Sequence, residues 1–299
     1  MKIANLVRNL RVMKAVTGLS YQEFTDLVPL FEKALIAIKM ENPKRMRRVG
    51  AGQKGHLPTA REKLFFTLFY YKTYPTFDVL GFWFNKSSGR SCEAIHLLTK
   101  AAEKALKHAL VLPIRKIATI EEFMEAFPEV KDLFLDGTER RIERPQNTKR
   151  NRRMYSGKKK AHTRKHIVVT DDKKRIRVLS PAKPGRRHDK RVTDSRLLAE
   201  RIPPHIHIWT DSGLKGLDKQ RPNTHIVKVG TKKHPLTDDE RTENRLIAAL
   251  RVVNEHGIGG MKRFHIMLYT LRNKIGHFDN RIAGVCAGLW NWHLNYATA

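Results

Sequence analysis

The stretch DLFLDGT, residues 132–138, is where the sequence changes from helical to strand patterns. Its continuous apolar run predicts a buried strand that ends in an acid, Asp136. A second such run, HIHIWTDSG at 205–213, ends in Asp211. Each acid also has an ordinary structural explanation, since Asp136 with Gly137 could form a turn and Asp211 could cap a following helix. The positions of the two strands in the fold decide between these interpretations.

The segments around these runs predict the element order β-β-β-α-β-α-β-α. After the first strand, the predicted elements are two further strands drawn from 140–145 and 161–185 and joined by the DDKK turn at 171–174, then a helix at 190–202. Strands at 205–211 and 224–230 follow, with a crossover helix between them, and a helix from 238 to 262 completes the order. This is the order of the ribonuclease H-like fold, an α/β architecture with a mixed five-stranded sheet. Its fourth and fifth strands are added in parallel beside the first. Asp136 and Asp211 are therefore expected side by side.

The last predicted helix contains RVVNEHGIGGMK, residues 251–262, and it offers a third acid. Arg251, Glu255 and Lys262 are spaced so that they share one helix face. Neighbouring carboxylates repel unless a cation lies between them, and oxygen ligands suit Mg²⁺ or Mn²⁺. Asp136, Asp211 and Glu255 are thus the candidate ligands of two Mg²⁺ ions, for which Mn²⁺ could substitute. Glu240 and Glu243 are rival third acids on the same helix.

Gly257, Gly259 and Gly260 follow the third acid directly. A glycine in a helix interior costs about 1 kcal/mol relative to alanine. We therefore expect the helix backbone here to lie close to the sheet or to a substrate strand.

The composition indicates a polyanionic partner. The 299 residues include 59 Lys and Arg against 29 Asp and Glu, a net charge of +30. Nucleic acid is the first partner that this excess suggests, and an anionic membrane surface the second.

No apolar run approaches the ~20 residues of a membrane span, and the N-terminus has no signal-peptide core. Cys92 and Cys286 are isolated, so neither a disulfide framework nor a zinc finger is encoded.

Helical patterns dominate the first part of the chain. Residues 16–40 predict a helical hairpin or long helix with a capping box from Ser20 to Glu23. A basic linker follows at 41–58, and a connecting helix with its own capping box is expected at 119–127. These segments bracket the region in which DNA reading is expected.

Residues 58–112 predict a helix-turn-helix region. A short helix, the polar turn NKSS at 85–88 and a longer helix form the motif, in which the second helix enters the major groove. Lys86, Arg90 and Ser91 lie at or near the start of that helix and are candidate DNA contacts. A plain three-helix bundle is the alternative interpretation.

Residues 139–191 form a second basic region, with 21 Lys and Arg against five acids. Such a run is often only a solvated face. Because it flanks the first acidic strand, we expect contacts with the DNA backbone, and the candidates are Lys158, Lys159, Lys160, Arg164 and Lys165. Asp189 precedes a predicted helix and could simply cap it.

Several blocks resemble a known family. LPTAREKLFFTLFYYKTYPTFDVLGFWF, LFLDGTERRIERP, YSGKKKAHTRKH, PGRRHDKRV and IWTDSGLKGL are similar to successive blocks of DDE transposases of the insertion sequence five group, which resemble the eukaryotic Harbinger transposases. The resemblance covers roughly residues 55–280. In its third acidic block the family has Tyr, Arg, Glu and Lys at fixed spacing. This chain keeps Arg251, Glu255 and Lys262 but has Ala248 in place of the tyrosine.

The resemblance implies a transposase that binds the terminal inverted repeats of a mobile element, cleaves DNA and joins the ends to a target. The catalytic set would be Asp136, Asp211, Glu255, Arg251 and Lys262. It also implies a homodimer or larger assembly on double-stranded DNA, no membrane partner, and a cytoplasmic, nucleoid-associated protein of a bacterial or archaeal host. The alternatives are a ribonuclease H-like nuclease without strand transfer and a domesticated DNA-binding regulator.

The expected domains follow the same division. Residues 1–55 are an N-terminal helical segment with the basic linker, 56–130 are the helix-turn-helix domain with the connecting helix, and 131–299 are the catalytic domain.

Overall fold

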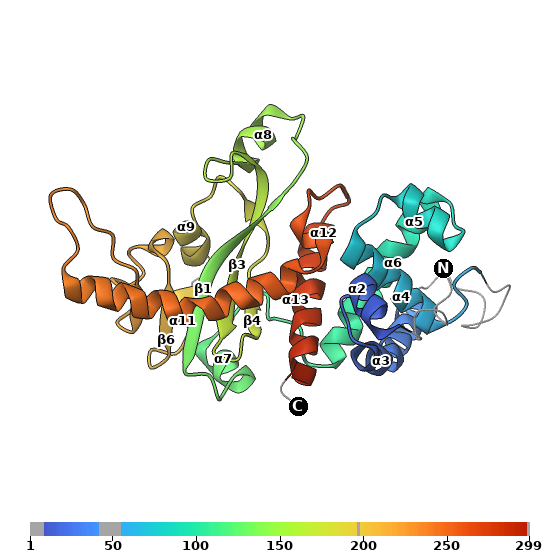
Figure 1. Cartoon of the computed structure of the whole chain (residues 1–299), viewed down its shortest axis with the longest axis horizontal. Helices are drawn as coiled ribbons and strands as arrows, with labels where there is room; N and C mark the ends of the chain where they lie inside the picture. Colours follow the sequence, from blue (N-terminus) through green and yellow to red (C-terminus); the bar gives the residue numbers. More distant parts are fainter. Residues whose placement is uncertain (1–8, 42–54, 196–197, 298–299) are drawn as a thin grey trace. The chain divides into compact units, whose positions relative to one another are not determined.

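The computed structural model describes residues 9–41, 55–195 and 198–297 (Figure 1). Most of the expected linker at 41–58 lies outside these residues. The chain forms two compact units: a sheet unit from Pro113 to Gly260, and a helical unit built from the segments before and after it. Residues 261–297 thus pack with the N-terminal helices, although we expected them in the catalytic domain. Packing units and functional domains need not coincide, and the expected functional ranges stay a prediction.

The helical unit contains the predicted helix-turn-helix segments. Its helices are α2 (Leu10–Thr17), α3 (Tyr21–Met40), α4 (Ala60–Thr73), α5 (Phe77–Phe84), α6 (Ser88–His108), α12 (His265–Leu268) and α13 (Phe278–Ala297). The capping box from Ser20 to Glu23 starts α3 as predicted. Helices α3, α5 and α13 all pack against α6. Tyr71 of α4 is fully buried, and its hydroxyl hydrogen-bonds the Thr99 hydroxyl of α6 at 2.7 Å.

The sheet unit contains the following elements in chain order: α7 (Ile120–Ala126), β1 (Asp132–Arg141), α8 (Thr148–Met154), β2 (Tyr155–Ser156), β3 (Ala161–Asp171), β4 (Ile176–Leu179), β5 (Lys183–Pro184), α9 (Asp189–Asp194), α10 (Leu198–Arg201), β6 (His207–Thr210), the 3₁₀ helix η1 (Ser212–Leu214), β7 (Thr224–Ile226) and α11 (Asp238–Lys262). Helix α8 lies at the far end of the long extension formed by β1 and β3 (Figure 1).

The sheet has the predicted mixed topology. Strand β3 is antiparallel to β1 and β4, whereas β6 is parallel to β1 and β7 is parallel to β6. These are the pairings expected for the ribonuclease H-like order. Two short strands, β2 and β5, were not predicted; both pair with β3. The two strands predicted around the DDKK turn are confirmed as β3 and β4. Residues 140 and 141, which were assigned to those further strands, belong instead to β1, and the crossover helix expected before the last strand is only the short η1.

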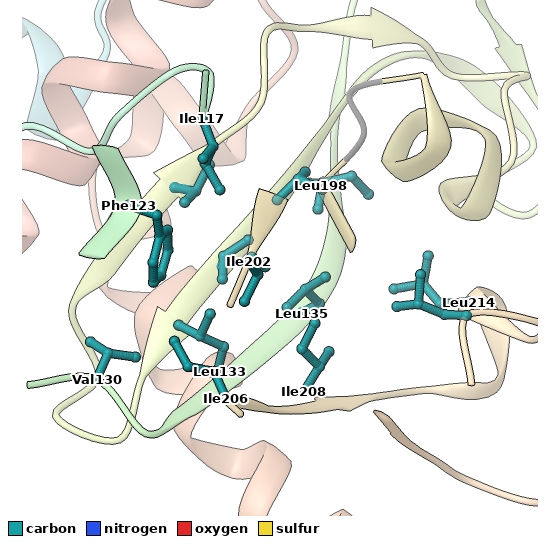
Figure 2. Close-up of a cluster of buried hydrophobic side chains, with 14 of the residues drawn as sticks. Ile117, Phe123, Val130, Leu133, Leu135, Leu198, Ile202, Ile206, Ile208 and Leu214 are labelled. Carbon is teal, nitrogen blue, oxygen red and sulfur yellow. The ribbon is translucent and has the colours of Figure 1, made fainter. Parts of the chain in front are cut away.

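One face of the sheet carries the hydrophobic core, and helix α11 covers the other. Leu133 and Leu135 of β1 point into a hydrophobic core with Ile208 of β6 and with residues from α7 and α10 (Figure 2). Because side chains alternate along a strand, Phe134 and Asp136 project from the opposite face. Helix α11 covers that opposite face (Figure 1). There Asn254 of α11 is buried and hydrogen-bonded to Thr170 of β3.

No helix in the described ranges is both long enough and apolar enough to span a bilayer.

Candidate active site

The two predicted aspartates are neighbours in the sheet. Leu135 of β1 pairs in parallel with Thr210 of β6, and Asp136 and Asp211 are the next residues along each chain segment. They consequently fall on the same face, the one that α11 covers. The Gly137 amide donates a hydrogen bond to Asp136 Oδ1 at 2.6 Å, and the Gly213 amide donates one to Asp211 Oδ1 at 2.9 Å. Asp211 therefore also caps η1, as its ordinary explanation predicted.

The pKa of Asp136 is raised in this arrangement. Burial raises the pKa of its carboxyl, and the nearby charge of Asp211 raises the pKa further. The Gly137 amide and Arg251 act in the opposite direction. Burial and a like charge both disfavour the ionised form of Asp136. A cation between the two carboxylates would offset their electrostatic repulsion. The oxygen-only donors fit Mg²⁺ or Mn²⁺.

Helix α11 brings Arg251 close enough to act on Asp136. Glu255 is one helical turn further on and is exposed. Within the described part of the chain, no group of three His, Cys, Asp or Glu residues is arranged to hold a metal ion. The structure thus brings Asp136 and Asp211 together, but it does not complete the expected trio with Glu255. Lys262 is the last residue of α11.

The rival third acids lie near the start of α11. Glu243 forms an ion pair with Lys228 at 2.8 Å, and Glu240 accepts a hydrogen bond from the Thr237 amide at 3.1 Å. Both carboxylates therefore have local structural roles at the beginning of the helix.

The glycines after Glu255 divide into two kinds. A Cβ atom on Gly257 would lie 2.6 Å from Thr170 Cγ2 and 3.4 Å from the Lys174 carbonyl oxygen. The expected close approach to the sheet is confirmed at this residue. A Cβ on Gly259 would meet nothing within 4 Å, so Gly259 does not approach the sheet, and the expected approach to a substrate strand stays a prediction there.

A buried ion cluster lies on the other face of β1. Lys165 Nζ is 3.2 Å from Glu139 Oε1 and 3.0 Å from Asp189 Oδ1. The Lys165 side chain is 7% exposed, so its predicted contact with the DNA backbone was wrong: the ammonium group is sequestered by two carboxylates. Asp189 is the first residue of α9 rather than its cap, and its carboxylate lies against Gly137, next to Asp136.

Alternation along β3 could have revealed this cluster. Lys165 is in phase with Ile167 and Val169, which belong to the core below the sheet. Its cross-strand partner is Glu139.

The other side chains predicted to contact the DNA backbone are more accessible. Lys158, Lys159 and Lys160 are exposed between β2 and β3, and Arg164 is half-buried and donates a hydrogen bond to the Ala182 carbonyl.

The start of α6 contains both an exposed and a buried candidate. Arg90 is exposed in the first turn, and Lys86 is half-buried just before it. Ser91, in contrast, is fully buried, so its predicted contact with a base was wrong. The sequence carried the signal, since Ser91 is four residues before the buried Ile95 and lies on the same apolar face.

Comparisons with known proteins agree with these features. A family model described as DDE superfamily endonuclease matches residues 135–291, and one described as helix-turn-helix of DDE superfamily endonuclease matches 55–107. The chain is similar to a protein of Microchaete diplosiphon described as "Probable transposase for insertion sequence element IS702", with 25% identity over 287 residues, which is 95% of each chain. No solved structure shows significant similarity.

Proposed function

Because the chain belongs to the DDE superfamily endonucleases, we propose that it is a transposase that cuts DNA at the ends of a mobile element and joins those ends to a target. The observation that carries the proposal is the pair of neighbouring aspartates, one on β1 and one directly after the parallel strand β6, of which Asp136 is half-buried and has a raised pKa. A protein that only binds DNA gains nothing from crowding carboxylates beside phosphates. The helix-turn-helix match and the similarity to a transposase support the same proposal.

In this proposal Asp136 and Asp211 bind the divalent metal ions, with Glu255 as the third acid. Two bound ions would activate the attacking oxygen and stabilise the leaving oxygen of the phosphodiester. Arg251 already acts on Asp136 from α11 and would neutralise phosphate charge. Lys262 would do the same from the end of that helix. The neighbouring amides of Gly137 and Gly213 orient the two aspartate carboxylates.

We further propose a division of DNA binding between the two basic regions. Helix α6 would read the terminal inverted repeats through Arg90, with Lys86 beside it. Lys158, Lys159 and Lys160 would contact phosphates of element or target DNA. Joining two ends requires both to be held together, which suggests a homodimer or larger assembly. A cytoplasmic, nucleoid-associated location stays a prediction.

Purified full-length protein tests the proposal on duplexes that carry the element's own ends. We expect nicking or cutting only with Mg²⁺ or Mn²⁺, followed by joined products when target DNA is added. Asp136→Asn, Asp211→Asn and Glu255→Gln should each abolish cleavage and leave end binding largely intact. Glu243→Gln is the matched control, because Glu243 pairs with Lys228 at the start of α11.

The outcomes separate the alternatives. Full cleavage in excess chelator would refute the metal-dependent mechanism. Cleavage without any joined product would identify a nuclease that does not transfer strands, and end binding without cleavage would identify a regulator. Activity of Glu255→Gln together with inactivity of Glu243→Gln would move the third acid to Glu243.

A further inference from the structure

A cavity of about 680 Å³ lies within the sheet unit, close to the aspartate pair but outside it. It is lined by residues 151–152 and 155–158 around α8 and β2, by Lys165 of β3, by 185–189 at the start of α9, and by Gly213 after β6. Its volume is within the roughly 300–1,000 Å³ of pockets that hold small ligands. The cavity is therefore large enough to accept one nucleotide.

The wall of the cavity adjoins both aspartates. Gly213 lines it and donates its amide hydrogen to Asp211 at 2.9 Å. Asp189 also lines it and lies against Gly137, the residue that follows Asp136. The cavity therefore lies within two residues of Asp211 along the chain and, through Asp189, next to the residue that follows Asp136.

The charge of the cavity is concentrated at its rim. Lys165 is neutralised by Glu139 and Asp189. Asp189 is also the one acid among the described residues that line the cavity. The remaining cations of the lining are exposed to solvent and are Arg152, Lys158, Arg186 and Arg187. Phosphate groups are the natural partners of these side chains.

An aromatic ring supplies a face for a base. Tyr155 lines the cavity and is 44% exposed. Its ring meets the His162 ring edge-on, with 5.5 Å between centroids. His162 Nε2 in turn is hydrogen-bonded to Asn151 Oδ1 at 2.8 Å. These contacts hold the tyrosine in place, so little rotamer freedom would be lost when a base stacks on it.

We propose that this cavity binds one unpaired nucleotide of the DNA strand next to the cleavage point, with its base stacked on Tyr155 and its phosphates at the cationic rim. A base inside a duplex already has neighbours on both faces, so only an unstacked base gains from the ring. The inference rests on the proposed function, since it takes DNA as the substrate.

The test compares two duplexes of identical sequence that differ in one added extrahelical 2-aminopurine nucleotide. Full-length protein binds them in EDTA, where no cleavage is expected. We expect tighter binding of the bulged duplex and a change in 2-aminopurine fluorescence on binding. Tyr155→Ala should weaken binding of the bulged duplex by at least about five-fold, the lower end for stacking on an aromatic side chain. Binding of the fully paired duplex should not change.

Two control variants sharpen the result. Tyr155→Phe keeps the ring and should behave as the wild type, whereas Tyr269→Ala removes a similarly exposed tyrosine from the helical unit and should have no effect. Equal binding of the two duplexes by the wild type would overturn the inference. An equal loss on both duplexes in Tyr155→Ala would also overturn it. Cleavage of element ends with Mg²⁺, measured separately, tells whether the proposed function still stands.

Discussion

Thr170 of β3 donates a hydrogen bond to Oδ1 of Asn254 on α11, with 3.1 Å between the two oxygens. Both residues are buried, and the bond connects the helix directly to the sheet. Gly257, one turn further along α11, has no room for a side chain against the Thr170 methyl group. The register of α11 on the sheet, and with it the position of Arg251, depends on this close packing.

We predict opposite effects of alanine at two glycines of α11. Gly257→Ala should lower the free energy of unfolding by roughly 1–3 kcal/mol, because Thr170 is β-branched, buried and cannot turn aside. Gly259→Ala should raise it by up to about 1 kcal/mol, because the site is open and alanine favours the helix. Urea denaturation of both variants measures the difference. Equal effects would show that the helix does not lie on the sheet as described.

We predict that Lys165→Met destabilises the protein by roughly 3–5 kcal/mol, because Glu139 and Asp189 would remain buried without their cation. Lys158→Met, at an exposed position, should change stability by no more than about 0.5 kcal/mol. Thermal and urea unfolding compare the two. A Lys165→Met protein as stable as the wild type, but weak in DNA binding, would restore Lys165 as a contact with phosphate.

We predict that Asp136→Asn stabilises the metal-free protein at neutral pH. The folded-state pKa of Asp136 is raised, so its stabilising contribution is present below the unfolded-state pKa and is lost as pH rises through the folded-state value. Above that value the ionised carboxylate opposes folding, and the amide removes this penalty. The melting temperature in EDTA should therefore exceed that of the wild type at pH 7, and the difference should shrink as pH falls toward the ordinary Asp pKa.

The same variant tests the metal site without an activity assay. Mg²⁺ should raise the melting temperature of the wild type more than that of Asp136→Asn, since a bound ion stabilises the folded state by mass action. Asp172→Asn, which changes an exposed acid in the turn after β3, serves as the control. Equal Mg²⁺ effects in all three proteins would contradict metal binding at Asp136.

We predict different defects from the two basic regions. Arg90→Ala should reduce the preference for the cognate end by about 1–3 kcal/mol if the side chain makes a bidentate base contact. Replacing Lys158, Lys159 and Lys160 together with alanine should weaken cognate and random DNA alike and flatten the salt dependence. Binding isotherms on both DNAs at several salt concentrations measure these effects. Loss of preference in the lysine variant, with a uniform loss in Arg90→Ala, would reverse the assignment.

Ser91→Ala is the control for the sequence-reading surface. Ser91 is buried in the same turn of α6 in which Arg90 is exposed. Removing its hydroxyl should therefore leave the preference for the cognate end unchanged. A specific loss with this variant would place Ser91 at the DNA after all.

The features that sequence predicted well are those encoded over short distances. The runs ending at Asp136 and Asp211 are local, and the order of elements around them was enough to place their strands side by side. The length of β1 was not predicted, because its second half is polar and is stabilised by a ladder with β3 rather than by apolar alternation. Pairings between distant residues, such as Glu139 with Lys165, depend on a strand register that no local pattern specifies.

The burial of Lys165 and Ser91 was overlooked for a different reason. Each lies in phase with apolar neighbours, so its position predicts burial although its residue type predicts exposure. A lysine can be buried when two carboxylates surround it, and a small serine fits an apolar helix face. Phase along an element is the better guide to exposure at such positions.

The packing of α13 against α6 has a consequence for synthesis on the ribosome. The segment around α6 emerges early, but α13 packs against it, with Gly288 close to the Leu106 side chain, and is translated after the whole sheet unit. The part of the α6 surface that α13 covers therefore stays exposed on the nascent chain until residues 278–297 have left the exit tunnel. A nascent chain interrupted within the sheet unit would lack α13 and would have an incomplete helical unit. The helical unit can be completed only after the whole sheet unit has been translated.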